Sequence, residues 1–205
     1  MKILGIVGSR RKRGNTAVLM QEALKPFQDQ GIDTELIYLG DYQITGCTGC
    51  EGCQDTFECM INDDMQKLYP KLLEYDAVIM GSPTYFYNVS GDMKTFIDRC
   101  YALEAFHKED RSVWISLNEV FGMKYAGVIA VCEQENEQDM GYTAETMERS
   151  LLALGFRVVS TVKAFKLFAE GEALTNNIEL NKAKNAGEKL LKTLQLKSNI
   201  ALGND

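Results

Sequence analysis

This 205-residue chain has a single histidine, no long apolar run and no excess of basic residues. Its single histidine, His107, has no carboxylate or nucleophile motif beside it, so catalysis by a histidine base is not expected. No stretch approaches eighteen uninterrupted apolar residues, so no membrane span is predicted. The net charge of −7 argues against a nucleic-acid partner, because no basic stripe is available to displace counterions from phosphates.

Signals for export and for internal duplication are also missing. Met1 leads directly into an apolar run, without the charged region and cleavable apolar stretch of a secretory leader. We therefore expect a cytoplasmic protein with reduced thiols. The sequence has no internal repeat and no low-complexity linker, and its length suits a single domain over residues 1–205.

Two nucleotide-binding signatures are absent from the first loop of the chain. The stretch from Gly8 to Thr16 lacks the G-x4-G-K-[ST] arrangement of a Walker loop, since Asn15 stands where lysine would be needed. The G-x-G-x-x-G fingerprint does not follow the first apolar run either. Tightly held NAD(P) is therefore not predicted.

Short apolar runs bounded by glycine, serine or proline recur along the chain and predict buried parallel strands. Helical patterns separate these runs, so the sequence predicts an α/β fold with a doubly wound five-stranded sheet. Residues 104–124 carry only a weak pattern, and we expect a long connection, a lid or an interface element there. The predicted strands are 2–7, 34–39, 77–81, 125–132 and 156–163, and the predicted helices are 15–31, 63–73, 90–103, 143–154 and 178–196.

Four of the six cysteines fall within thirteen residues. Cys47, Cys50, Cys53 and Cys59 are spaced C-x2-C-x2-C-x5-C, with a glycine in both two-residue gaps. Disulfides are the least favoured use, because cysteines so close in sequence strain when bridged. Zinc usually takes two C-x2-C pairs separated by a long insert, whereas this compact spacing favours one [4Fe–4S] cluster. Zinc remains the alternative.

The basic loop from Gly8 to Thr16 joins the first strand to the first helix. Ser9 and Thr16 offer hydroxyls, and the helix start offers free N–H groups and the positive end of its dipole. These features predict a site for a phosphate monoester. A plain capped turn with solvated arginines is the alternative.

Aromatic residues follow the third predicted strand, between Ser82 and Gly91. In a doubly wound sheet, ligands bind beyond the carboxyl ends of the strands. The side chains of Tyr85, Phe86 and Tyr87, with exposed backbone amides, suit a flat heteroaromatic ring. Alone they would be read as rim packing, but together with the phosphate loop they indicate a cofactor site.

These segments together resemble the NADPH-dependent FMN reductases of flavodoxin-like fold. The resemblance rests on the loop 8–16, the run 81–86 and the segment 90–99, and it continues more loosely to the end of the chain. The four-cysteine insertion after the second strand, followed by Asp63-Asp64-Met65, resembles the iron–sulfur flavoprotein branch in particular. We call residues 41–63 the cysteine loop.

The resemblance implies a sheet of strand order 2-1-3-4-5, a [4Fe–4S] cluster on the four cysteines, and a homodimer or homotetramer. Electrons would pass between the cluster, FMN and a partner, with ferredoxin or NAD(P)H as donor. The alternative is an NAD(P)H-dependent FMN or quinone reductase whose cysteine loop binds zinc or is only structural. The residues expected to bind FMN are Ser9, Arg11, Lys12, Gly14, Asn15, Thr16, Pro83, Thr84, Tyr85, Phe86, Tyr87 and Asn88.

Other reactive or charged residues have simpler interpretations. Lys94, Asp98 and Arg99 lie at helical spacing, which predicts a surface cluster of ion pairs. Cys100 and Cys132 fall on a helix face and at a strand end, where a thiol usually acts as a small buried hydrophobe. Cys132 also has a modest claim to lie near the flavin, because the loop 133–136 follows a core strand.

Overall fold

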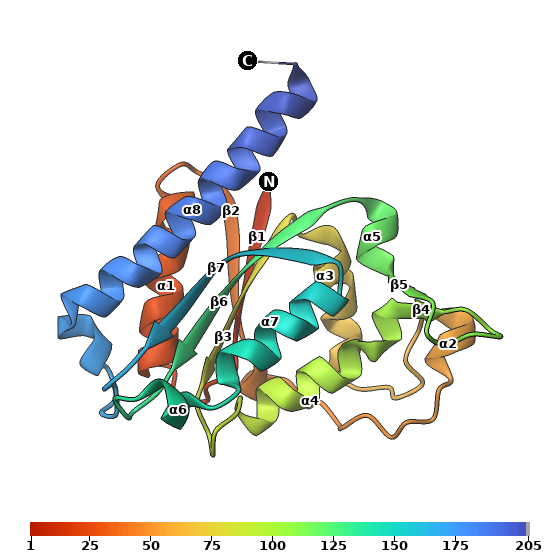
Figure 1. Cartoon of the computed structure of the whole chain (residues 1–205), viewed down its shortest axis with the longest axis horizontal. Helices are drawn as coiled ribbons and strands as arrows, with labels where there is room; N and C mark the ends of the chain where they lie inside the picture. The colour runs from red at the N-terminus through yellow and green to blue at the C-terminus, as the bar shows by residue number, and fades with distance from the viewer. Residues whose placement is uncertain (204–205) are drawn as a thin grey trace.

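Residues 1–203 are described in the computed structural model, where a parallel sheet lies between two layers of helices (Figure 1). The sheet order β2-β1-β3-β6-β7 confirms the predicted order 2-1-3-4-5, which is that of flavodoxin-like folds. Every neighbouring pair is parallel. The strands are β1 (Lys2–Val7), β2 (Asp33–Tyr38), β3 (Ala77–Pro83), β6 (Lys124–Val131) and β7 (Phe156–Ala164).

Two helices, α1 (Asn15–Gln28) and α8 (Asn177–Leu202), cover one face of the sheet, and α3 (Tyr69–Glu74), α4 (Gly91–Arg99) and α7 (Thr143–Ala153) lie on the other (Figure 1). The helices α1 and α8 approach closely at Gly187, where an added Cβ would lie 2.0 Å from the carbonyl oxygen of Ala23. No side chain fits at this crossing. No helix within residues 1–203 has both the length and the apolar character needed to cross a membrane.

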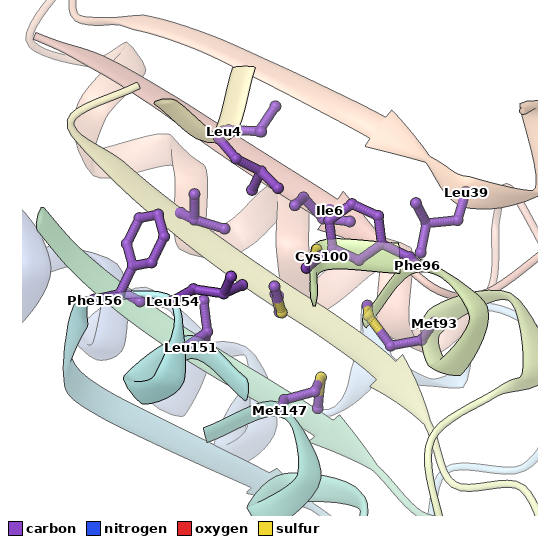
Figure 2. Packing of buried hydrophobic residues seen from close by; sticks show 14 of the residues in the cluster. Leu4, Ile6, Leu39, Met93, Phe96, Cys100, Met147, Leu151, Leu154 and Phe156 are labelled. Carbon is purple, nitrogen blue, oxygen red and sulfur yellow. The ribbon is translucent and has the colours of Figure 1, made fainter. Parts of the chain in front are cut away.

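Continuous apolar runs form the central strands because both faces of the sheet are covered. Leu4 and Ile6 of β1, Met93 and Phe96 of α4 and Met147 of α7 belong to one buried cluster, in which Ile6 lies beside Phe96 (Figure 2). All five are fully buried. Cys100 belongs to the same core and Cys132 is also buried, as predicted.

Short elements fill segments that the sequence pattern left open. Residues 104–124 contain an antiparallel hairpin of β4 (Glu104–Phe106) and β5 (Trp114–Ser116), followed by α5 (Leu117–Phe121). The predicted helix 90–103 divides at Arg99 into α4 and the 3-10 turn η3 (Cys100–Leu103). The remaining elements are η1 (Leu39–Asp41), α2 (Cys53–Thr56), η2 (Asp64–Lys67), α6 (Glu137–Met140) and η4 (Glu172–Thr175).

Candidate functional site

A pocket with a volume of about 490 Å³ lies at the carboxyl edge of the sheet. It forms where the strand order reverses between β1 and β3, which is where ligands bind in open α/β sheets. The loop after β1 and the turn after β3 line two of its sides. Segments that follow β6 and β7 complete the wall.

Ten of the twelve residues predicted to bind FMN line this pocket, and Lys12 and Asn88 do not. The ammonium group of Lys12 instead pairs with Asp41 and lies 4.0 Å from the centre of the Tyr38 ring. The Asn88 side chain accepts hydrogen bonds from its neighbour's N–H and from the Thr146 hydroxyl. Those in the lining are Ser9, Arg11, Gly14, Asn15, Thr16, Pro83, Thr84, Tyr85, Phe86 and Tyr87.

The loop after β1 has the features of an anion site. Gly14 precedes α1 and has no side chain to cap it, so the N–H groups of the first turn keep their capacity to bind a ligand. The Ser9 hydroxyl accepts a hydrogen bond from the Arg11 N–H at 3.2 Å, which fixes the loop. The guanidinium of Arg11 is exposed and makes one long bond, 3.4 Å, to the Phe168 carbonyl.

Asn15 joins the loop after β1 to the loop after β7. Its side-chain amide donates to the carbonyl of Ala169 at 2.9 Å, and its oxygen accepts from the N–H of Ala173 at 2.9 Å. Each end of the side-chain amide therefore has one partner within the protein. Asn15 borders the pocket and holds the wall in place, and its amide nitrogen carries a second N–H that these bonds do not use.

A tight turn presents the aromatic residues after β3. Tyr85 and Asn88 bond to each other through their backbones, and Phe86 and Tyr87 between them have φ angles of 49° and 67°. Left-handed backbone costs about 1–2 kcal/mol per non-glycine residue. The Tyr142 N–H donates to the Tyr87 carbonyl at 2.8 Å and holds the turn against the next helix layer. The Phe86 ring is 95% exposed at the pocket mouth.

One buried oxygen in the pocket wall has no partner. Thr84 Oγ1 is inaccessible to solvent and makes no hydrogen bond within residues 1–203. Buried hydroxyls are normally satisfied, because leaving one unpaired costs free energy. Because Oγ1 has no accessible surface, a ligand would reach it only after the Thr84 side chain turns toward the pocket. The uncapped helix start, the Arg11 guanidinium and the aromatic turn are the features that fit the phosphate and the polar ring system of FMN.

Sequence reasoning missed the far wall of the pocket. These residues carry no recognisable motif, and the only usable signal was their position after the carboxyl ends of the fourth and fifth predicted strands. Cys132, which has only a modest sequence-based claim to a place near the flavin, is among them. The missed lining residues are Val131, Cys132, Glu133, Gln134, Asp139, Leu167 and Phe168.

The four clustered cysteines occupy different environments. Cys47 and Cys50 are exposed, Cys53 is buried and Cys59 is partly buried. The Gly52 N–H and the Thr48 hydroxyl lower the pKa of Cys50, while burial raises the pKa of Cys53. Thiolates with N–H donors suit soft metal centres, so the donor set fits a cluster. In the described part of the chain, no three His, Cys, Asp or Glu side chains are gathered around one metal position.

Arg99 closes the base of the cysteine loop. The prediction that Arg99 joins a surface cluster is wrong, because its side chain is 0% exposed and pairs with Asp63 at 2.7 Å. Helical spacing identified only the exposed Lys94–Asp98 pair correctly. The partner of Arg99, Asp63, is 36 residues away in the sequence, and no local sequence pattern predicts this pair.

The hairpin β4–β5 lies against the tip of the cysteine loop (Figure 1). Arg111, in the hairpin turn, pairs with Glu51 at 3.0 Å and stacks 4.8 Å from the centre of the Phe106 ring. The Gln54 amide donates to the Glu104 carbonyl at 3.4 Å. The cysteine loop is thus held at its base by α4 and at its tip by the hairpin.

Comparison with known proteins gives the chain its family. The sequence profile described as "NADPH-dependent FMN reductase" matches residues 1–165. An iron–sulfur flavoprotein of Archaeoglobus fulgidus is 35% identical over 200 residues, covering 96% of this chain and 82% of that protein. An iron–sulfur flavoprotein of Methanocaldococcus jannaschii is 40% identical over 99 residues, 48% of this chain, and the match spans about half (51%) of that relative's length.

Solved structures share the fold at lower sequence identity. A NAD(P)H:quinone oxidoreductase from Methanothermobacter marburgensis superposes with a TM-score of 0.71 at 15% identity, covering 93% of this chain and 98% of that one. Its likeness supports the sheet architecture alone. Because the family profile covers most of the chain and an iron–sulfur flavoprotein matches nearly all of it, the chain belongs to the NADPH-dependent FMN reductase family of flavin-dependent oxidoreductases, and within it to the iron–sulfur flavoprotein branch.

Proposed function

We propose that this protein binds FMN in the carboxyl-edge pocket and a [4Fe–4S] cluster on Cys47, Cys50, Cys53 and Cys59, and passes electrons between them and a redox partner. The observation that carries the proposal is the pocket itself, which joins an uncapped helix start, an exposed guanidinium and an aromatic turn in one cavity. FMN would supply the redox chemistry, and the protein would supply position, hydrogen bonds and dielectric.

The roles of the pocket residues follow from their contacts. The first-turn N–H groups of α1, with Ser9, Thr16 and the Arg11 guanidinium, would bind the phosphate. The rings of Tyr85 and Phe86, with backbone groups of the turn, would stack on the isoalloxazine and bond to it. Thr84 Oγ1 would bond to a polar edge of the ligand once its side chain turns toward the pocket.

For the electron donor, we propose a nicotinamide dinucleotide or a ferredoxin. The family description supports the nicotinamide, and the exposed thiols of Cys47 and Cys50 support a route for electrons from a protein donor. The chain has no dinucleotide fingerprint, so a nicotinamide would bind transiently at the mouth of the pocket. We place the protein in the cytoplasm, because thiolate ligands need a reducing compartment.

We also propose that the chain assembles into a homodimer or homotetramer. The segment 104–124 supports an interface, because its side chains Val113, Trp114, Ile115, Val120 and Phe121 are large, apolar and exposed. Light scattering of the purified protein at several concentrations tests this. A monomer at every concentration would contradict it.

Analysis of anaerobically purified protein tests the cofactors. About one FMN, four iron and four acid-labile sulfides per chain are expected. One zinc without sulfide would replace the cluster with a structural metal, and failure to take up FMN would refute the flavin site. Changing Cys50 and Cys53 to alanine should abolish iron binding and leave a folded protein that binds FMN. The control Cys100→Ala removes a buried thiol outside the loop and should retain iron.

A further inference from the structure

We propose that Arg99 and Asp63 form a clasp that closes the cysteine loop before any metal is bound, and that this clasp positions Cys59 to join the other three cysteines. The proposal rests on the cluster assignment made above and deepens it. Arg99 is a positioning residue in this scheme and is not a ligand.

One guanidinium contacts both ends of the cysteine loop. The Nη1 atom of Arg99 donates to the carbonyl of Thr45 at 2.7 Å, on the segment that enters the cysteines. The Nη2 atom donates to the carbonyl of Ile61 at 3.3 Å, on the segment that leaves them. The same two nitrogens bind the carboxylate of Asp63 at 2.7 and 3.2 Å. This arrangement needs the planar fork of arginine, since a lysine ammonium cannot span all three groups.

The carboxylates next to the clasp tie the two ends to each other. Asp63 accepts from the Thr45 N–H at 2.8 Å, and Asp64 accepts from the Gln43 N–H at 2.8 Å. The Asp64 N–H returns a bond to the Gln43 carbonyl at 3.2 Å. Every one of these contacts is made by protein groups, so the loop is closed at its base without a metal.

Cys59 lies beside this closed base. The side-chain amide of Gln66 donates to the carbonyls of Cys59 and Ile61 at 2.8 and 2.9 Å, which fixes the backbone on both sides of Met60. Cys59 also packs against the buried core. The last gap in the cysteine spacing is five residues, so Cys59 depends more on the loop's closure for its place than Cys47, Cys50 and Cys53, which follow one another at two-residue gaps.

Stability alone is a weak reason to bury this pair. Burying two charged groups costs solvation free energy, and apolar side chains of similar volume would fill the same space without that cost. Moreover, the Nε–H of Arg99 is buried with no hydrogen-bond partner in the described residues. The clasp therefore keeps one buried N–H without a hydrogen bond, beside a loop that carries four candidate sulfur ligands. A contact that served stability alone would not be expected to leave a buried donor unpaired.

Cysteine alkylation of the metal-free, reduced protein tests the clasp directly. In the unaltered protein Cys47 and Cys50 should react fast, Cys59 slowly, and the buried Cys100 and Cys132 hardly at all. Arg99→Gln and Arg99→Lys should accelerate Cys59 by about tenfold or more and leave Cys100 and Cys132 slow. Lys94→Gln is the matched control, because it breaks the exposed ion pair on the same helix and should change none of the rates.

Iron and sulfide uptake on anaerobic reconstitution gives the second readout. Arg99→Gln should load less than half of the cluster loaded by the unaltered protein, Arg99→Lys an intermediate amount, and both should bind FMN normally. An unchanged Cys59 rate, or equal acceleration of Cys100 and Cys132, would overturn the clasp. If Arg99→Gln does not fold, Arg99→Lys, which keeps the charge beside Asp63, decides the test.

The same experiment separates the two proposals. If the unaltered protein takes up no iron or sulfide, the cluster assignment fails, whatever the alkylation rates are. If it takes up a full cluster and the Arg99 variants do so equally well, the cluster assignment holds and the positioning role is wrong.

Discussion

Thr84→Val should change the stability of the empty protein and its affinity for FMN in opposite directions. The hydroxyl of Thr84 is buried without a partner, and valine replaces it with a methyl group of similar size. An unsatisfied buried hydroxyl costs about 1–3 kcal/mol, and its removal should return up to that amount to the FMN-free protein. For a chain of this length this corresponds to a rise in Tm of about 2–12 °C.

The same substitution removes the hydrogen bond that we expect the Thr84 hydroxyl to make with FMN once its side chain turns toward the pocket. A neutral hydrogen bond contributes about 0.5–1.5 kcal/mol, which corresponds to a Kd that is about two- to thirteenfold weaker. Calorimetry of the FMN-free protein measures the first effect, and quenching of FMN fluorescence on titration measures the second.

Thr143→Val is the matched control for this experiment. Its hydroxyl is also buried, but it donates to the Met140 carbonyl at 2.8 Å. Valine at Thr143 should therefore lower the Tm and leave FMN affinity unchanged. If Thr84→Val lowers the Tm in the same way, or if FMN binds equally well, the hydroxyl of Thr84 is not held in reserve for a ligand.

Three further outcomes are expected. Arg11→Ala should weaken FMN binding about tenfold or more in a salt-dependent way, because the exposed Arg11 guanidinium borders the pocket, whereas Lys12→Ala should not, because Lys12 pairs with Asp41. FMN titrations at two salt concentrations measure this, and equal weakening by the two substitutions would contradict it. Gly187→Ala should destabilise the protein by about 1–3 kcal/mol in denaturant unfolding, because the new Cβ must move about 1 Å away from Ala23. The control Asn185→Ala, at an exposed position of the same helix, should be neutral or stabilising. Burial raises the pKa of Asp63, but hydrogen bonds from Arg99, Thr45 and Met65 outweigh burial and leave that pKa below its ordinary value of 3.8. The ionised Asp63 therefore stabilises the folded protein fully above about pH 4, and this stabilisation is lost as the pH falls further, so acid unfolding of Asp63→Asn should lack this pH-dependent loss.

The central sheet could be predicted because its signal is local. The apolar runs of β1, β3 and β6 are continuous and buried on both faces, and each is followed by a loop with distinct chemistry. By contrast, β4 and β5 have three residues each, which is too short for any period to appear. Aromatic packing supports the hairpin, because the Phe106 ring contacts both Trp114 across the hairpin and Tyr101 in η3.

The site was predictable where a loop carries its own chemistry and not where distant segments meet. The composition of residues 85–87 and of the loop after β1 is enough to indicate a ligand site. Phe168 reaches the pocket only because β7 ends beside β6, and Arg99 is buried only because Asp63 arrives from another part of the chain. Lys12, which we predicted to bind FMN, pairs with Asp41 and does not line the pocket, and the local sequence carries no signal of that pairing.

The link made by Asn15 determines which parts of the pocket can vary. Its two partners are backbone groups, the carbonyl of Ala169 and the N–H of Ala173, so neither of those positions is restricted in its side chain by the bond. The whole sequence constraint falls on residue 15. Phe168 can therefore be replaced by larger, smaller or charged residues while the bonds of Asn15 still hold its loop in place. Substitutions at this position would change which molecules fit at the pocket mouth and leave the phosphate end unchanged.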